Sequence, residues 1–430
     1  MLFSIKNAIC FFQMAFAATL IAAENHQIIL SLDKPGGIYK KAENALVSAE
    51  YRVNGKPADG LLRAEIIDPI GSRKTIDFPA SQKRISVPMT GNAVRIVVSA
   101  IGPDGKIIHT REGKKLKKVS ASIGMAADPH EIQPGLKEPE DFQSFWDNTV
   151  AELAKIPIKV KRTEVETAAH ARGKFKCWDI QVDCIDGVPV SGYLTMPANA
   201  APKSLPVMVE FQGAGVFSSW KTYMDGAIHL CINAHGLPNG RPKEFYAKLA
   251  GTKLLRYQRR NSDDRDRYYF RNVFLRVQRA LEYVRTLPEY DGKTLIVYGH
   301  SQGGAQAIFA AGMNPDVSMI FACMPAMCDH GGILAGRKSG WPQLVGMRNG
   351  RPTSPKIAKT LAYYDMAFFA RRIKGEAYFI VGLLDATCCP TSVFAAFNCI
   401  PGKKNMTVLP DTDHDGRMLS LLMIKNFKKR

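Results

Sequence analysis

The stretch TLIVYGHSQGGAQAIFAAGMN, residues 294–314, places a single serine where a predicted strand gives way to a predicted helix. β-Branched and aromatic residues precede it, and small apolar residues with helical spacing follow it. Its centre, GHSQG at 299–303, fits the pattern G-x-S-x-G. A tight turn of this kind strains the serine, lifts its hydroxyl above the edge of the sheet and points a helix N-terminus at it. We therefore predict that Ser301 is a nucleophile, rather than part of a glycine-rich structural turn.

A serine nucleophile needs a base and an orienting acid, which in this kind of fold follow it in the chain. Asp385 ends the apolar stretch YFIVGLLD, and His414 follows the stretch NMTVLP. Both positions are carboxyl ends of predicted strands, the edge at which open α/β sheets bind ligands. Asp411, Asp413 and Asp415 compete for the role of the acid, but they lie very near His414 in the sequence, so we predict Asp385.

The oxyanion formed during attack would need two backbone N–H donors. One is expected from Gln302, the residue after the nucleophile. The second is expected from a loop after an earlier strand. The stretch EFQGAG at 210–215 ends such a strand, and Ala214 is the candidate donor there.

Metal binding is not indicated. The sequence DTDHDG at 411–416 imitates the start of an EF-hand loop, but its twelfth position is Leu422, where a bidentate glutamate is required. No Cys/His cluster has zinc spacing. We expect neither a metal nor an organic cofactor.

The length of 430 residues suggests two domains. Residues 24–122 contain short alternating stretches separated by turn dipeptides such as Asn54-Gly55, which predicts a β-sandwich of the immunoglobulin type. Residues 123–138 are expected to be a linker. Residues 139–430 alternate apolar and helical stretches, which predicts an α/β domain with a mainly parallel sheet covered by helices on both faces.

Residues 1–23 have the layout of a signal peptide, with one early lysine, an apolar run and small residues ending at Ala22-Ala23. The run is short for a membrane span, which needs ~20 apolar residues. We therefore predict export, to the periplasm or the extracellular space, rather than a membrane anchor or a buried N-terminal helix. No membrane partner is expected.

The mature chain would keep eight cysteines, an even number that permits disulfides without defining a pairing. Cys177 and Cys184 lie in one predicted strand, ~23 Å apart, too far to bond each other. The formal net charge is +19, with basic residues spread along the chain. Without aromatic interleaving this favours a basic surface and no nucleic-acid partner, with attraction to an acidic polysaccharide as the alternative.

Residues 139–425 resemble the acetyl xylan esterase/cephalosporin C deacetylase family of carbohydrate esterases, which are α/β-hydrolases. The resemblance lies in PEDFQSFWDNTVAEL, VSGYLTMPANA, GHSQGG, AMCD and GLLDATCCPTSVFAAFNCIPGKKNMTVLPDTDHDG. It implies a serine esterase that deacetylates acetylated carbohydrates such as acetyl-xylan or xylo-oligosaccharides. Ser301, Asp385 and His414 would be its triad, with Ala214 and Gln302 as oxyanion donors. Family members often form closed homo-oligomers, although an added N-terminal domain could obstruct that packing.

The chain departs from the family at several positions. It has QGAG at 212–215 where the family usually has His-Gly-Tyr-Gly, so Ala214 replaces a tyrosine. His235-Gly236 stands where Arg-Gly is usual, and an acid often found near Arg276 is missing. These changes leave open a broader esterase or a serine peptidase on the same fold. A carbohydrate-binding module that has lost its activity is the third alternative, and the intact Ser, Asp and His argue against it. Because every predicted site residue follows the first domain, we expect its removal to spare hydrolysis of small esters.

Overall fold

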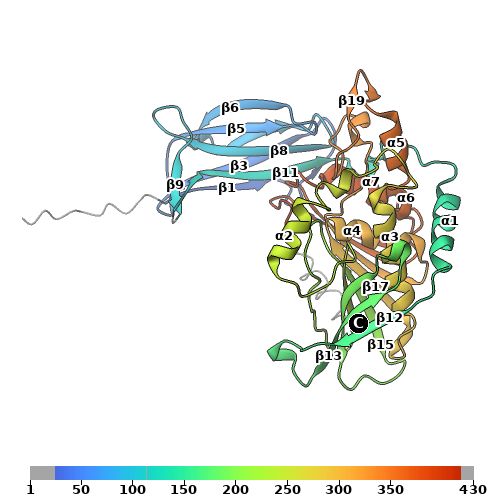
Figure 1. The fold of residues 1–430 in the computed structure, drawn as a ribbon. Helices are drawn as coiled ribbons and strands as arrows, with labels where there is room; N and C mark the ends of the chain where they lie inside the picture. Colours follow the sequence, from blue (N-terminus) through green and yellow to red (C-terminus); the bar gives the residue numbers. More distant parts are fainter. Residues whose placement is uncertain (1–24, 113, 418–430) are drawn as a thin grey trace, which may run out of the picture.

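The structure is a computed structural model that describes residues 25–112 and 114–417. The predicted signal peptide, residues 1–23, lies outside the described residues. Figure 1 shows an N-terminal body of strands attached to one side of a larger α/β body. Among the described residues, no helix is long and apolar enough to cross a membrane.

The N-terminal body consists of two main sheets and a separate hairpin. One sheet has the order β1-β3-β4 with β7 on β3, and the other has the order β2-β11-β8-β5-β6. Alternate residues such as Val47, Leu62 and Ile96 are fully buried in a core of their own. The strands are β1 His26–Leu32, β2 Ile38–Tyr39, β3 Asn44–Val53, β4 Lys56–Pro57, β5 Leu61–Ile67, β6 Arg73–Pro79, β7 Arg84–Pro88, β8 Ala93–Ile101, β9 His109–Glu112, β10 Lys115–Lys118 and β11 Ser120–Ala127.

The last N-terminal strand extends past the boundary expected at residue 122. Strand β11 continues to Ala127 and pairs with β8 and β2, so the predicted linker begins inside a strand. Its sequence, SASIGMAA, is dominated by small residues, which hide the alternation that marks a strand. Helix α1, Phe142–Ala154, follows and buries Phe142, Trp146 and Leu153.

The α/β body is built on one nine-stranded sheet, in the order β12-β13-β14-β16-β15-β17-β18-β21-β22. The first strands are antiparallel, and all pairs from β16 to β22 are parallel. The sheet strands are β12 Val160–Glu164, β13 Phe175–Val182, β14 Val190–Pro197, β15 Leu205–Phe211, β16 Ile228–Asn233, β17 Tyr290–His300, β18 Val317–Cys323, β21 Glu376–Gly382 and β22 Lys404–Leu409. A small hairpin adds β19 Met347–Arg348 and β20 Arg351–Pro352.

Helices pack on one face of this sheet around an aromatic cluster. Trp146, Phe274, Phe309 and Phe369 are buried there with ring centroids 4.6–6.2 Å apart. The other face has a smaller core that includes Phe321. The sequence pattern predicted helices on both faces of the sheet, and their presence on this second face stays a prediction. The further helices are α2 Lys243–Gly251, α3 Tyr269–Val284, α4 Gln302–Met313, α5 Pro355–Ala362, α6 Met366–Ala370 and α7 Pro390–Asn398.

The two bodies meet at the carboxyl end of the nine-stranded sheet. The Gly124 N–H of β11 donates to the Pro410 carbonyl, just after β22, at 2.7 Å. The Lys338 N–H donates to the Pro69 carbonyl at 3.1 Å. A cavity of about 130 Å³ lies between the bodies, and Asp385 is among its lining residues. The N-terminal body therefore touches the part of the sheet where the predicted site lies.

All eight cysteines from residue 177 onward lie in the described chain, and each is a free thiol. Cys177 and Cys184 are buried and not bonded to each other, as expected, but the strand is shorter than predicted: β13 ends at Val182, so Cys184 lies two residues beyond it. Apolar cores, rather than disulfides, hold the described residues together.

Candidate active site

Ser301 lies at the turn between β17 and α4 with φ 58° and ψ −122°, a conformation that is strained for a residue with a side chain. The glycines on either side make this turn fit. A Cβ on Gly299 would lie 2.4 Å from the Gly303 carbonyl carbon, and a Cβ on Gly303 would lie 2.0 Å from the Phe211 carbonyl oxygen. The G-x-S-x-G spacing is thus required by backbone contacts between β15, β17 and α4.

His414 and Asp385 reach Ser301 from two neighbouring strand ends. Asp385 follows β21, and His414 follows β22. The His414 Nδ1 lies 2.7 Å from the Asp385 Oδ2, and its Nε2 lies 2.9 Å from the Ser301 Oγ. The structure therefore brings together the three residues that the sequence nominated.

The hydrogen-bond partners of Asp385 define the proton positions in this chain. Its Oδ1 accepts the N–H groups of Thr387 and Cys388 at 2.8 and 2.9 Å, so both carboxylate oxygens act as acceptors. The His414 Nδ1 must then carry the proton that it donates to Oδ2. The unprotonated Nε2 faces Ser301, which is the tautomer that a general base needs.

Two of the three competing aspartates, Asp411 and Asp415, have side-chain partners other than His414. Asp415 pairs with the Arg417 guanidinium, whose hydrogen bond lowers the pKa of Asp415 to about 2. Asp411 is exposed and accepts from the neighbouring Thr412 hydroxyl. In the described contacts, the carboxylate bonded to His414 is that of Asp385.

The predicted oxyanion donors belong to two segments near Ser301: Gln302 follows it directly, and Ala214 lies in the loop after β15. Gln302 is the first residue of α4, so its N–H has no acceptor within the helix. The loop after β15 also approaches Ser301, because a Cβ added to Gly213 would lie 3.9 Å from the Ser301 Cβ. Ala214 follows and is exposed. The Gln306 side chain donates to the Gln212 carbonyl at 2.9 Å and holds this loop on α4.

His235 supports the same loop, a role that the sequence did not predict. Its Nε2 lies 2.9 Å from the Gly215 carbonyl and its Nδ1 lies 2.7 Å from the Tyr269 hydroxyl. Because a carbonyl only accepts, Nε2 carries the proton and the tyrosine donates to Nδ1. Burial lowers the pKa of His235 to about 4, which keeps this neutral form. Arg276 donates to the adjacent Ala234 carbonyl. His235-Gly236 stands where the family usually has Arg-Gly, and this departure was the signal in the sequence that pointed to position 235.

His300 lies beside the proposed base. Its ring centroid is 4.5 Å from that of His414. Burial, followed by the proximity of His414, lowers the pKa of His300 to about 4. A neutral His300 can pack against His414 without the repulsion that a second cation would cause.

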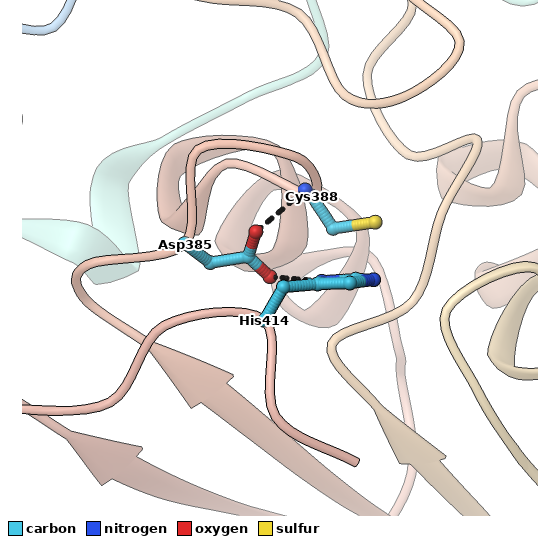
Figure 2. A group of neighbouring side chains, drawn as sticks. All are labelled: Asp385, Cys388 and His414. Carbon is cyan, nitrogen blue, oxygen red and sulfur yellow. Dashed lines mark hydrogen bonds and ion pairs between the residues drawn. The ribbon is translucent and has the colours of Figure 1, made fainter. Parts of the chain in front are cut away.

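Cys388 is a further neighbour that sequence reasoning missed. Its side chain is fully buried, and burial raises the pKa of its thiol well above the ordinary value of 9.0. Figure 2 shows the thiol and the His414 imidazole projecting to the same side of Asp385. One ligand atom from each of Asp385, Cys388 and His414 lies within 4.8 Å of the other two.

A strained serine on a mainly parallel sheet, with an acid and a histidine at later strand ends, defines an α/β-hydrolase. The family model "Acetyl xylan esterase (AXE1)" matches residues 127–428. The chain therefore belongs to the acetyl xylan esterase family and is a carboxylic ester hydrolase, which confirms the resemblance found in the sequence.

Individual relatives agree with this assignment. The chain is similar to the acetyl esterase Axe7A of Xylanibacter ruminicola, at 28% identity over 389 residues that cover 88% of this chain and 84% of the relative. The acetyl xylan esterase from Paenibacillus sp. R4 has 26% identity and a TM-score of 0.58, covering 70% of this chain and 98% of its own. Acetyl xylan esterase 1 from Thermoanaerobacterium sp. JW/SL YS485 shares the fold, with 24% identity, a TM-score of 0.59 and coverage of 69% and 96%.

Proposed function

We propose that the protein is a serine esterase that removes acetyl groups from acetylated xylan or xylo-oligosaccharides. The observation that carries the proposal is the hydrogen-bonded chain from Ser301 through His414 to Asp385. Family membership supports the substrate class, since both the family and the relative from Xylanibacter ruminicola are named for acetyl ester hydrolysis.

In the proposed reaction, the Ser301 Oγ attacks the carbonyl carbon of the acetyl ester while the His414 Nε2 takes the hydroxyl proton. Asp385 holds the imidazole and stabilises its charged form. The N–H groups of Ala214 and Gln302 stabilise the oxyanion. His414 then returns the proton to the departing sugar oxygen, which leaves an acetyl-serine. A water molecule, activated by the same histidine, releases acetate and restores the serine.

The test of this proposal is acetate release from acetylated xylan by wild type and by Ser301→Ala. Loss of a triad nucleophile costs at least ~10⁴-fold in rate, because the covalent step disappears. The matched control is Ser204→Ala, since the Ser204 hydroxyl donates to the exposed Ala201 carbonyl at 2.7 Å and has no part in the proposed reaction. A serine-directed organophosphate should label wild type at Ser301 alone. Near-wild-type turnover by folded Ser301→Ala would refute the assignment.

A broader esterase is the second candidate, favoured by the exposed Ala214, which follows Gly213 in the loop that approaches Ser301. An alanine leaves more room at the pocket mouth than the tyrosine expected from the family. Comparison of acetylated xylan with propionyl and butyryl esters separates the two candidates. A preference for the longer simple esters over acetylated glycan would favour the broader enzyme.

The proposal includes two features of the N-terminal region. Residues 1–23 would direct export, which matches a polymeric substrate outside the cell. The strands of residues 26–127 would form an immunoglobulin-like sandwich, supported by two sheets around one core. N-terminal sequencing of the secreted protein would test the first feature, with Glu24 as the expected first residue.

A further inference from the structure

A second kind of chemistry overlaps the triad. Three residues that commonly bind metal ions, an aspartate, a cysteine and a histidine, converge at Asp385, Cys388 and His414. They come from two loops, since Asp385 and Cys388 follow β21 and His414 follows β22. The esterase reaction proposed above uses the carboxylate and the imidazole but gives the thiol no role.

The distances between the ligand atoms of these three side chains suit a small thiophilic cation. Zinc binds sulfur at about 2.3 Å and nitrogen or carboxylate oxygen at about 2.0–2.2 Å, so two tetrahedral ligands lie roughly 3.5 Å apart. The three ligand atoms here lie within 4.8 Å of one another, so a rotamer adjustment of roughly 1 Å suffices. The thiol and the imidazole already project to the same side of the carboxylate (Figure 2). The His414 side chain is 25% exposed, which gives a cation a route from solvent.

We propose that Asp385, Cys388 and His414 bind one thiophilic divalent cation, such as Zn²⁺ or Cd²⁺, and that the bound cation inhibits the esterase reversibly. Binding forms a metal–sulfur bond and releases the thiol proton to solvent. The cation takes a carboxylate oxygen and an imidazole nitrogen from the triad, and where that nitrogen is Nδ1 its proton moves to Nε2. His414 can then no longer accept the Ser301 proton, so acylation stops. The inhibitory effect rests on the proposed function, whereas the binding does not.

Binding is measured first, without substrate, on the full-length protein. Cd²⁺ is the probe, because a cadmium–thiolate bond gives a near-ultraviolet charge-transfer band that titrates with occupancy. One equivalent of Cd²⁺ should produce the band in wild type and in Ser301→Ala, which separates this test from the test of catalysis. Cys388→Ser should abolish the band. His414→Gln should weaken binding at least tenfold, since even the loss of an outer partner costs a site 10–100-fold in affinity.

Cys389→Ser is the matched control, because the Cys389 thiol contacts the Ser339 and Ala386 carbonyls, each at 3.7 Å, rather than the triad. It should keep both the band and the inhibition. In the esterase assay, the Zn²⁺ concentration that halves each variant's own metal-free rate should rise at least tenfold in Cys388→Ser. Chelation should restore activity, and Cd²⁺ should slow organophosphate labelling of Ser301.

The outcomes decide the proposal. Absence of the band in folded wild type, its persistence in Cys388→Ser, or its loss in Cys389→Ser would each overturn it. Inhibition by Zn²⁺ that is equally strong in wild type and Cys388→Ser would show that the cation acts elsewhere on the protein. A normal band in a wild-type protein that lacks esterase activity would support the site and refute the proposed function instead.

Discussion

Replacing Gly124 with alanine tests whether the N-terminal body holds Asp385 in place. Gly124 lies in β11 against Leu383, two residues before Asp385. A Cβ on Gly124 would lie 2.5 Å from the Leu383 Cβ and 2.6 Å from its carbonyl oxygen. Ordinary contacts begin at 3.4 Å, so the backbone at Leu383 must move by roughly 1 Å. No flexible side-chain end is available to absorb the change.

The expected effect is larger on catalysis than on folding. A misplacement of ~1 Å at a catalytic group can cost ~10²-fold in rate, whereas overpacking typically costs about 1–3 kcal/mol in the free energy of unfolding. We expect Gly124→Ala to lower kcat about 10–100-fold with little change in KM. In the proposed reaction the carboxylate acts mainly on the imidazolium of the transition state, which is why the loss should appear in kcat.

The assay is hydrolysis of p-nitrophenyl acetate, with urea unfolding of the same samples to measure stability. Gly36→Ala is the control, because Gly36 lies in the same body with open space around the added methyl group. A double-mutant cycle with Asp385→Asn gives the sharper result. If Gly124→Ala acts through the position of Asp385, it should cost little further activity once the carboxylate is gone.

Full activity in Gly124→Ala, or an equal loss in both backgrounds, would refute this reasoning. The same contact alters the expectation that removal of the N-terminal body spares small-ester hydrolysis. Removal would leave Leu383 without its cover and the Pro410 carbonyl without the Gly124 N–H. The structure therefore predicts that a truncated protein loses activity even towards p-nitrophenyl acetate.

Other changes have equally specific outcomes. Ala214→Tyr should narrow the pocket and shift kcat/KM towards acetyl over butyryl p-nitrophenyl esters by about 1–3 kcal/mol; an unchanged chain-length profile would mean that Ala214 does not face the substrate. His235→Phe should free the Gly215 carbonyl and lower kcat by roughly tenfold, about the effect of one lost buried hydrogen bond, and retained kcat would show that the loop needs no such support. His330 is buried, and burial lowers its pKa from 6.5 to about 4. The unfolded chain binds this proton at a higher pH than the folded protein does, so stability should fall as the pH drops from 6.5 towards 4. Urea unfolding across that range should show a smaller loss of stability with falling pH in His330→Leu than in wild type. An identical pH dependence in both proteins would contradict the lowered pKa of His330.

The sequence could predict the hydrogen-bonded triad because local rules constrain each member. The glycines around Ser301 are needed by a turn that brings three backbone segments within contact distance. Asp385 and His414 follow apolar stretches that become adjacent parallel strands, and parallel strands present their carboxyl ends at one edge. Asp385 could be chosen as the acid because the other candidate aspartates lie too near His414 along the chain. Each inference depended on neighbouring residues and on one property of the sheet.

The supporting contacts could not be predicted in this way. The bonds of His235 to Gly215 and Tyr269 join three separate loops or helices, and no spacing rule connects them. The predicted boundary at residue 122 falls inside the strand that ends at Ala127, because the small residues of this strand lack an alternating pattern. Both features depend on tertiary packing that cannot be predicted from a single sequence.

Gly124 matters both for recognising the strand in the sequence and for the contact that supports the site. Its smallness obscured the strand that contains it, yet the same smallness lets that strand lie against Leu383 with its N–H bonded to Pro410. A larger residue would have made β11 easier to recognise and would have pushed the loop of Asp385 out of position. The predicted boundary at residue 122 therefore failed at the place where the first body supports the site of the second. The division of the chain into a β-sandwich domain and an independent catalytic domain does not hold at this contact.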